Sequence, residues 1–254
     1  MLFFSLLVSF SCLQARAQTP AKLPELRMGS ATSAPLPLAD FVTDQGKTQI
    51  VQGIYVDIAR ELAQELGTKI EVRVVPRVRI SNELEKGYLD FVCYYRPSWL
   101  KGDFLFLDDI FQTGDYIVWR AGAPPIKSLS QLEGIRLGTA RGYAHPEIEV
   151  GLGKKFNRVE YESVDAVVKK MLLKDVDYII LNKLNYDYIS KTSLYAGKMA
   201  EKPLLITSFR TGCAISQKAR MEPMRIRVGL ENMLKKGTFK KILKSYGLED
   251  SAVQ

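Results

Sequence analysis

The strongest constraint on the fold of this chain is a repeated switch between two hydrophobic periods in its first hundred residues. Residues 57–66 place apolar side chains on one helical face, and Gly67 follows as a C-cap. Residues 70–74 then alternate apolar and charged side chains, which is typical of a strand. A second helix is expected over residues 80–86, followed by an apolar strand over residues 89–94.

With a short strand over residues 26–29 in front, this region has the order strand, helix, strand, helix, strand. That order predicts a parallel sheet covered by helices. A second α/β unit follows along the chain. Its expected elements are strands over residues 117–119, 135–138 and 178–181, a capped helical turn over residues 128–132 and a helix over residues 164–173.

Two extended segments that each end in glycine, residues 111–114 and 209–212, bracket this second unit. After Gly212 the chain is expected to form a strand and two basic amphipathic helices, which we expect to rejoin the first unit. The sequence therefore predicts an α/β protein of two lobes joined by a double crossover hinge. The predicted boundaries are residues 18–111 and 212–254 for lobe 1 and residues 112–211 for lobe 2.

The N-terminal segment has the features of a secretory signal. Residues 2–13 form the longest apolar run, which is shorter than the roughly 18–20 residues that span a membrane. Ala15-Arg16-Ala17 follows as an A-x-A cleavage pattern. Cys12 lacks the preceding residues of a lipid-attachment signal. We therefore predict a signal peptide over residues 1–17 and a periplasmic protein.

Basic residues are concentrated near the C-terminus. The chain carries 36 Lys and Arg against 28 Asp and Glu, and between Lys218 and Lys244 nine basic residues accompany only two acidic ones. A solvated helical face is one interpretation, and docking onto an acidic partner or a membrane surface is the other. Nucleic acid is not an expected partner, because an exported protein meets little of it and this tract has few aromatic residues for stacking.

Four short motifs occur in a fixed order along the chain. They are G-I-Y-V-D-I-A at residues 53–59, L-E-K-G-Y-L-D at 84–90, K-S-L-S-Q-L-E-G at 127–134 and K-G-T-F-K-K-I at 236–242. With them the chain resembles bacterial extracellular solute-binding proteins of the polar amino-acid type, family three, over about residues 26–247.

This resemblance implies a periplasmic-binding-protein-like clamshell, in which each lobe is a mixed, mostly parallel sheet flanked by helices. It also implies a receptor that binds a small-molecule ligand and delivers it to an inner-membrane permease of the ABC type. We expect a monomer that needs no cofactor.

In lobe 1 the chain departs from the family pattern at the positions that the resemblance assigns to the ligand. The arginine that binds the ligand carboxylate falls near Leu100 or Lys101, so Arg96 is a candidate to take that role from another place. The alternative for Arg96 is a loop residue that pairs with Asp103 or Asp108.

The family's stacking aromatic aligns with Arg77, a cation that would favour a carboxylate-bearing ligand. The alternative for Arg77 is a solvated charge at the start of a helix. Three aromatic residues nearby, Tyr94, Tyr95 and Trp99, are candidates for the stacking wall instead.

In lobe 2 the resemblance points to the loop Gly142-Tyr143-Ala144, where backbone N–H groups at a helix start would bind the ligand carboxylate. The family's acidic residue for the ligand ammonium is replaced by Asn182, which offers a hydrogen bond without charge. Because both poles are altered, we expect a small polar, carboxylate-bearing solute that need not be a common α-amino acid.

Catalysis is the alternative to ligand binding. The chain has a single His, so no metal signature is present, and it lacks a nucleophile elbow and a phosphate-binding glycine loop. His145 lies beside the predicted anion-binding loop, and a few proteins of the implied fold are dehydratases of cyclic prephenate-like acids. A structural or solvent-facing His145 is the other interpretation. A third function is a ligand-sensing partner of a membrane receptor.

The resemblance also bears on the two cysteines that remain after signal cleavage. Cys93 lies near the end of the strand predicted over residues 89–94, and Cys213 opens the strand after the second hinge crossing. In the implied fold these strands are antiparallel neighbours, so a cross-strand disulfide is a candidate in an oxidising compartment. Two buried thiols are the alternative.

Overall fold

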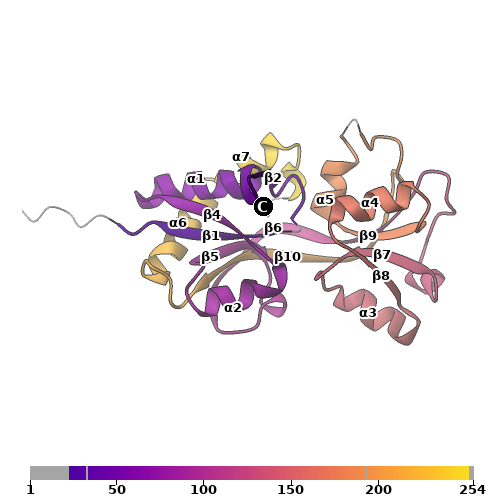
Figure 1. Cartoon of the computed structure of the whole chain (residues 1–254), viewed down its shortest axis with the longest axis horizontal. Helices are drawn as coiled ribbons and strands as arrows, with labels where there is room; N and C mark the ends of the chain where they lie inside the picture. The colour runs from indigo at the N-terminus through magenta and orange to yellow at the C-terminus, as the bar shows by residue number, and fades with distance from the viewer. Residues whose placement is uncertain (1–22, 33, 193, 252–254) are drawn as a thin grey trace, which may run out of the picture.

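The computed structural model describes residues 23–32, 34–192 and 194–251, so the predicted signal peptide lies outside the described residues. Its central element is one eight-stranded sheet with the strand order β4-β1-β5-β10-β6-β9-β7-β8. The sheet runs through both lobes of an elongated molecule, and helices lie on its faces in each lobe (Figure 1). Among the described residues no helix is long and apolar enough to cross a membrane.

Lobe 1 contains three parallel strands, β1 (Leu26–Ala31), β4 (Ile70–Val75) and β5 (Phe91–Tyr95). Its helices are α1 (Ile54–Leu66), α2 (Ile80–Glu85), α6 (Pro223–Lys235) and α7 (Thr238–Ser245), with the 3-10 turns η1 (Arg77–Arg79), η2 (Pro97–Trp99) and η5 (Glu249–Ser251). As predicted, α1 buries its apolar face and ends at Gly67 in the left-handed conformation. Both α6 and α7 pack against α1, so the chain returns to lobe 1.

Lobe 2 contains the parallel strands β7 (Arg136–Ala140), β8 (Asn157–Tyr161) and β9 (Tyr178–Asn182). Its helices are α3 (Pro146–Leu152), α4 (Val164–Leu172) and α5 (Lys183–Ile189), with the 3-10 turns η3 (Leu129–Leu132) and η4 (Gly153–Lys155). The predicted turn over residues 128–132 is η3, which Ser128 and Gln131 close as a capping box. The sequence patterns did not reveal β8 or the seven-residue helices α3 and α5.

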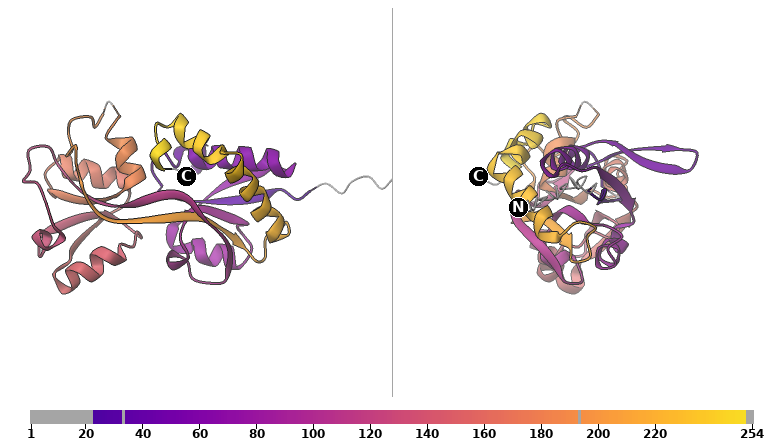
Figure 2. Two further views of the ribbon diagram at one scale, coloured as in Figure 1. Left: turned by 180° about the vertical axis from the view of Figure 1, so that it is seen from behind. Right: turned by 90° about the vertical axis from the view of Figure 1, so that its left-hand side faces the viewer.

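Two long antiparallel strands connect the lobes. β6 (Phe104–Trp119) and β10 (Leu204–Ser216) run side by side from one lobe into the other (Figure 2). β10 pairs with β5 in lobe 1, and β6 pairs with β9 in lobe 2. The glycines that end the two predicted hinge segments let these backbones approach closely. A Cβ on Gly114 would lie 2.0 Å from the carbonyl oxygen of Thr207, and one on Gly212 would lie 1.9 Å from that of Leu107.

Two features differ from the predicted elements. β2 (Asp40–Asp44) and β3 (Lys47–Gln52) form a separate hairpin that projects from lobe 1 (Figure 2). The hairpin escaped prediction because it is mostly exposed and lacks an alternating apolar pattern. α1 begins at Ile54 rather than Asp57, because Gly53 turns the chain with a φ of 123°.

The predicted cross-strand disulfide is confirmed. Cys93 on β5 and Cys213 on β10 lie directly opposite one another and are bonded. They are 120 residues apart in the sequence, so the bridge closes a loop that contains all of lobe 2. The alternative of two buried thiols is therefore wrong.

Each lobe has an apolar core of its own, and Leu184 of α5 in lobe 2 joins the core of lobe 1. Lobe 1 has one continuous core that includes Ile58 of α1 and Phe91 of β5. Lobe 2 has two, one on each side of its sheet, because successive residues of a strand face opposite sides. Val118 belongs to one of these cores and its neighbour Ile117 to the other. The separate cores leave the polar side chains at the inner ends of the strands to face one another between the lobes.

Candidate functional site

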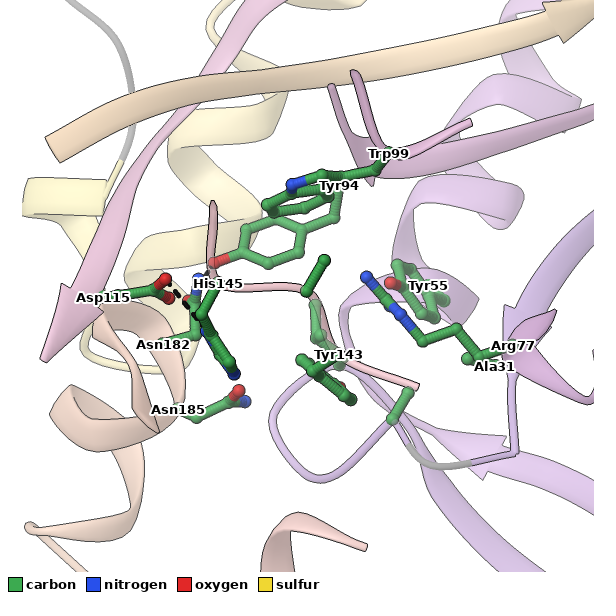
Figure 3. Close-up of a pocket in the computed structure, with 13 residues that line it drawn as sticks. Ala31, Tyr55, Arg77, Tyr94, Trp99, Asp115, Tyr143, His145, Asn182 and Asn185 are labelled. Carbon is green, nitrogen blue, oxygen red and sulfur yellow. Dashed lines mark hydrogen bonds and ion pairs between the residues drawn. The ribbon is translucent and has the colours of Figure 1, made fainter. Parts of the chain in front are cut away.

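A small, largely enclosed cavity lies between the lobes, and both lobes and the hinge contribute side chains to it. Figure 3 shows Arg77 entering from lobe 1, opposite Asp115, His145, Asn182 and Asn185. The lining residues are Ala31, Ala34, Leu38, Tyr55, Arg77, Tyr94, Trp99, Asp115, Tyr143, Ala144, His145, Asn182 and Asn185. Six of these were expected from the sequence, namely Arg77, Tyr94, Trp99, Tyr143, Ala144 and Asn182.

Arg77 is the cation of this cavity. It opens η1 directly after β4, and its Nε donates to the carbonyl oxygen of Gly142 in lobe 2 at 3.0 Å. Its guanidinium carbon lies 4.3, 5.2 and 5.7 Å from the ring centres of Tyr143, Tyr95 and Trp99. No carboxylate of the described residues lies within ion-pair distance of Arg77.

The charge on Arg77 is retained at this position. Burial alone would lower the pKa of Arg77, but the surrounding tyrosine oxygens, led by Tyr95 and Tyr143, outweigh burial and raise it. A cation that is stacked on aromatic rings and lacks a carboxylate partner leaves its charge available to an anion.

Tyr94 reaches across the cavity from the end of β5. Its backbone has a φ of 67°, a left-handed conformation that a bulky residue rarely adopts. Burial raises the pKa of Tyr94 far above its usual value, so its hydroxyl stays protonated. That hydroxyl donates to Oδ1 of Asn182 in lobe 2 and lies 2.7 Å from the hydroxyl oxygen of Thr113 on β6.

Asn182 is engaged by the protein itself. Its Oδ1 accepts from Tyr94, from the hydroxyl of Thr113 at 2.7 Å and from the backbone N–H of Leu184 at 3.1 Å. The last of these bonds makes Asn182 the N-cap of α5. Because its carbonyl oxygen already accepts three hydrogen bonds, Asn182 joins lobe 1, the hinge and lobe 2 and has no free acceptor for a ligand ammonium.

A buried polar triad, which the sequence did not reveal as a group, forms the wall beside Asn182. Nδ1 of His145 lies 2.9 Å from Oδ2 of Asp115, and Nε2 lies 2.8 Å from the hydroxyl oxygen of Thr139. His145 is only 3% exposed. Both ring nitrogens of His145 are thus paired inside the protein, as its structural interpretation requires.

Asp115 was missed although it carried a signal. It is a single acidic residue between Gly114 and the apolar end of β6, and it pairs in register with Asn182 of β9. The residues that follow it in β6 are apolar, so an acidic side chain at this position is a candidate for a functional site.

Two further side chains that line the cavity have a buried nitrogen atom without a hydrogen-bond partner. Nδ2 of Asn185, on α5, is a buried donor that has no acceptor among the described residues. Nε1 of Trp99 is in the same situation. Buried donors in native proteins are nearly always satisfied, so these two indicate where ligand oxygen atoms would bind.

Three expected site residues do not line the cavity. Tyr95 supports Arg77 through its ring, and its hydroxyl oxygen lies 3.5 Å from a guanidinium nitrogen. Gly142 contributes its carbonyl oxygen to Arg77. Arg96 points to the rim instead, where Nη1 lies 3.4 Å from Oε1 of Glu147 in lobe 2 and the guanidinium stacks on Phe209.

Arg96 therefore pairs with neither Asp103 nor Asp108, its expected loop partners. β5 extends to Tyr95, and the chain then turns through η2, which directs Arg96 toward lobe 2. Glu147 on α3 is thus its partner.

Sequence analysis predicted two backbone N–H donors for the ligand, those of Tyr143 and Ala144, and they are not equally available. The N–H of Tyr143 donates to the carbonyl oxygen of Ala140 at 3.2 Å, so it is already used in a turn. The N–H of Ala144 has no acceptor among the described residues, and Ala144 lines the cavity. Of the two predicted donors, only the N–H of Ala144 is left for a ligand.

The family model of bacterial extracellular solute-binding proteins, family 3, matches residues 26–249. The chain belongs to this family. Comparison with curated protein sequences found no match.

Three solved structures illustrate the shared fold of this solute-binding protein. The arginine-, lysine-, histidine-binding protein ArtJ from Geobacillus stearothermophilus is 17% identical, with 88% of this chain and 95% of that chain covered and a TM-score of 0.66. The ancestral amino acid-binding protein AncCDT-1, a precursor of cyclohexadienyl dehydratase, is 21% identical, with 87% and 94% covered and a TM-score of 0.69. A histidine kinase sensor domain is 19% identical, with 89% and 96% covered and a TM-score of 0.70.

The lobes of this solute-binding protein touch directly across the cavity. Arg77 bonds to Gly142, Tyr94 to Asn182 and Arg96 to Glu147, and each pair joins lobe 1 to lobe 2. Within the described ranges no three His, Cys, Asp or Glu residues cluster closely enough to hold a metal ion. The structure is thus a closed arrangement whose polar groups converge on one small cavity.

Proposed function

We propose that this protein binds a small polar, carboxylate-bearing solute between its lobes in the periplasm and delivers it to an ABC-type importer of the inner membrane. The observation that carries the proposal is the Arg77 guanidinium, which lines the cavity and has no carboxylate partner among the described residues. A guanidinium forms its strongest hydrogen bonds with a planar anion such as a carboxylate, because two parallel N–H···O bonds can form at once.

The opposite wall supports a ligand with further oxygen atoms. The backbone N–H of Ala144, the amide of Asn185 and the indole N–H of Trp99 are donors that the protein leaves unpaired. Asp115 adds a carboxylate that lines the same cavity. The proposed ligand-contacting set is Arg77, Trp99, Ala144, Asn185 and Asp115, with Tyr94, Tyr95, Arg96, Gly142, Tyr143 and Asn182 positioning it or holding the lobes together.

Closure would couple ligand binding to a shape that an importer recognises. We place the lobe boundaries at residues 111/112 and 211/212, since Phe111 and Thr211 are paired where the two crossing strands leave lobe 1. Export through the signal peptide of residues 1–17 and action as a monomer belong to the same proposal.

The test is calorimetry on the purified protein with amino acids, mono- and dicarboxylic acids and polyamines. A ligand at 100 times its dissociation constant adds about 2.7 kcal/mol of stability, so a thermal-shift screen can select the candidates first. We expect carboxylate-bearing compounds to bind and polyamines not to. Arg77→Gln should weaken binding by about 2 kcal/mol, roughly 30-fold.

The matched control is Arg73→Gln. Arg73 lies on β4 of the same lobe, is exposed and pairs with Glu71, and it does not line this cavity. Equal losses in the two variants, or binding of polyamines alone, would show that Arg77 does not hold a ligand carboxylate.

A dehydratase acting on a cyclic prephenate-like acid is the second candidate, because AncCDT-1 has this fold and is described as a precursor of such an enzyme. It requires a proton donor or acceptor in the cavity. Asp115 and His145 line the cavity but bond to each other, and the second ring nitrogen of His145 bonds to Thr139, so the protein itself occupies these groups, which favours binding over catalysis. Incubation with a prephenate-like acid tests it, since an aromatic product that His145→Asn abolishes would identify an enzyme. The sensor-domain neighbour keeps a ligand-sensing role as the remaining alternative.

A further inference from the structure

Three lysines cover the exposed side of α7, and none of them lines the ligand cavity. Lys240, Lys241 and Lys244 follow one another at helical spacing and are all exposed. The opposite side of the helix is buried in lobe 1 through Phe239, Ile242 and Leu243. Figure 2 shows α7 at the surface of lobe 1, next to α1. We refer to Lys240, Lys241 and Lys244 as the lysine face.

Among the side chains that the structure describes, no carboxylate forms an ion pair with the lysine face. α1 packs against α7 and carries three acidic residues, but these are engaged elsewhere. Asp57 and Glu61 pair with Arg60, and Glu65 pairs with Lys236. η5 also packs against α7, and its Asp250 makes no ion pair with these lysines. The lysine face therefore presents three exposed ammonium groups without an ion-pair partner among the described side chains.

Like charges four residues apart destabilise a helix, so this arrangement has a cost that a negatively charged partner would remove. A lysine ammonium is a compact charge on a flexible stem, which suits many phosphate geometries but specifies none. The three lysines lie on the exposed side of a helix and do not line the cavity between the lobes. Its chemistry thus favours a diffuse anionic surface over a shaped acidic partner.

We propose that the lysine face of α7 binds the anionic headgroups of a phospholipid membrane. The negative surface potential of such a membrane attracts lysines that lie near its surface. Because the apolar side of α7 is already buried in lobe 1, the helix remains folded on the protein and the contact is electrostatic, without insertion. This contact would keep the protein near a membrane surface whatever its ligand is, and it does not rest on the proposed function.

The experiment measures co-sedimentation of the purified protein with vesicles of phosphatidylglycerol and phosphatidylcholine, compared with vesicles of phosphatidylcholine alone. We expect binding only to the anionic vesicles at about 20 mM salt and release at about 500 mM, where charges are screened within a few ångströms. The triple variant K240Q/K241Q/K244Q should bind roughly 100-fold more weakly, as expected for the loss of three lysines near an anionic surface. The triple arginine variant should retain binding.

The matched control is K154Q/K198Q/K202Q, which removes three exposed lysines of the other lobe and changes the net charge equally. It should bind anionic vesicles nearly as well as the unaltered protein. Equal weakening in the two triple variants would overturn the proposal, since net charge alone would then explain binding. Binding to pure phosphatidylcholine, or to soluble poly-glutamate but not to anionic vesicles, would overturn it as well.

Discussion

The hydroxyl of Tyr94 donates to the side-chain carbonyl of Asn182, which lies 88 residues further along the chain and in the opposite lobe. The bond joins the end of β5 to the start of α5 at one wall of the cavity. Because Asn182 also caps α5 and accepts from Thr113 of β6, this one amide connects both lobes and the hinge. Closure of the lobes is therefore coupled to local structure on each side of the cavity.

Replacing Tyr94 by Phe removes the donor and keeps the ring. The closed form should lose about 0.5–1.5 kcal/mol, the net value of one such hydrogen bond, so ligand affinity should fall roughly 2- to 10-fold. Calorimetry measures the affinity, and small-angle scattering of the ligand-free protein should show a larger radius of gyration. Tyr88→Phe is the control, because Tyr88 lies in lobe 1, is largely exposed and does not line the cavity. Unchanged affinity and scattering in Tyr94→Phe would mean that the bond does not favour closure.

The buried pair of Asp115 and His145 predicts an effect on stability rather than on binding alone. His145→Ala leaves the Asp115 carboxylate without its donor, which should lower the free energy of unfolding by about 1–3 kcal/mol. Adding Asp115→Asn to that variant should restore part of the loss, because the unpaired charge is removed. Urea unfolding of the two single variants and the double variant gives the coupling energy. Additive losses would show that the two side chains are energetically independent.

The sequence predicted the parts of this fold that bury a regular apolar face. The helix α1 and the strand β4 have clear periods because each packs one side against a core. The hairpin of β2 and β3 packs little of its surface and carries no such pattern. The paired cysteines were placed correctly because the family resemblance fixed the neighbours of two strands.

The site was harder to predict than the fold, for a physical reason. Arg77 occupies the position where the resemblance places the family's stacking aromatic, and Tyr94 was one of the aromatic candidates near it; both line the cavity. Asp115 and Asn185 reach the cavity only because β6 crosses into lobe 2 and α5 turns back over β9. Such long-range placement leaves no local pattern in a single sequence.

The disulfide predicts a large dependence of stability on redox conditions. Cys93 and Cys213 close a loop of about 120 residues, which restricts the unfolded chain strongly. Reduction, or the variant C93A/C213A, should lower the free energy of unfolding by about 2–5 kcal/mol. Urea midpoints with and without reductant measure this loss, and C93A/C213A should no longer respond to reductant. In the denatured, unreduced protein that lacks residues 1–17 we expect no reactive thiol, and two would contradict the bridge.

Alkaline pH should destabilise the protein through its buried tyrosines. Burial raises the pKa of Tyr55, Tyr94 and Tyr95 above the usual value of about 10, and it raises the pKa of Tyr186 and Tyr195 to about 12. Below pH 10 these groups are protonated in both states, so their contribution to stability is complete. Above pH 10 the unfolded chain releases protons that the folded protein retains, and the free energy of unfolding falls as the pH rises.

Each such tyrosine contributes at most about 1.4 kcal/mol per pH unit to this slope. Urea unfolding between pH 9 and pH 11.5 should therefore show a steep loss of stability, and phenolate absorbance should rise together with the loss of circular dichroism. Tyr195→Phe removes one titrating group near α4, where its hydroxyl donates to Asp165, and should make the slope shallower. If all tyrosines ionised near pH 10 while the circular dichroism stayed native, their burial would not stabilise the protonated form, and the expected loss of stability would be absent.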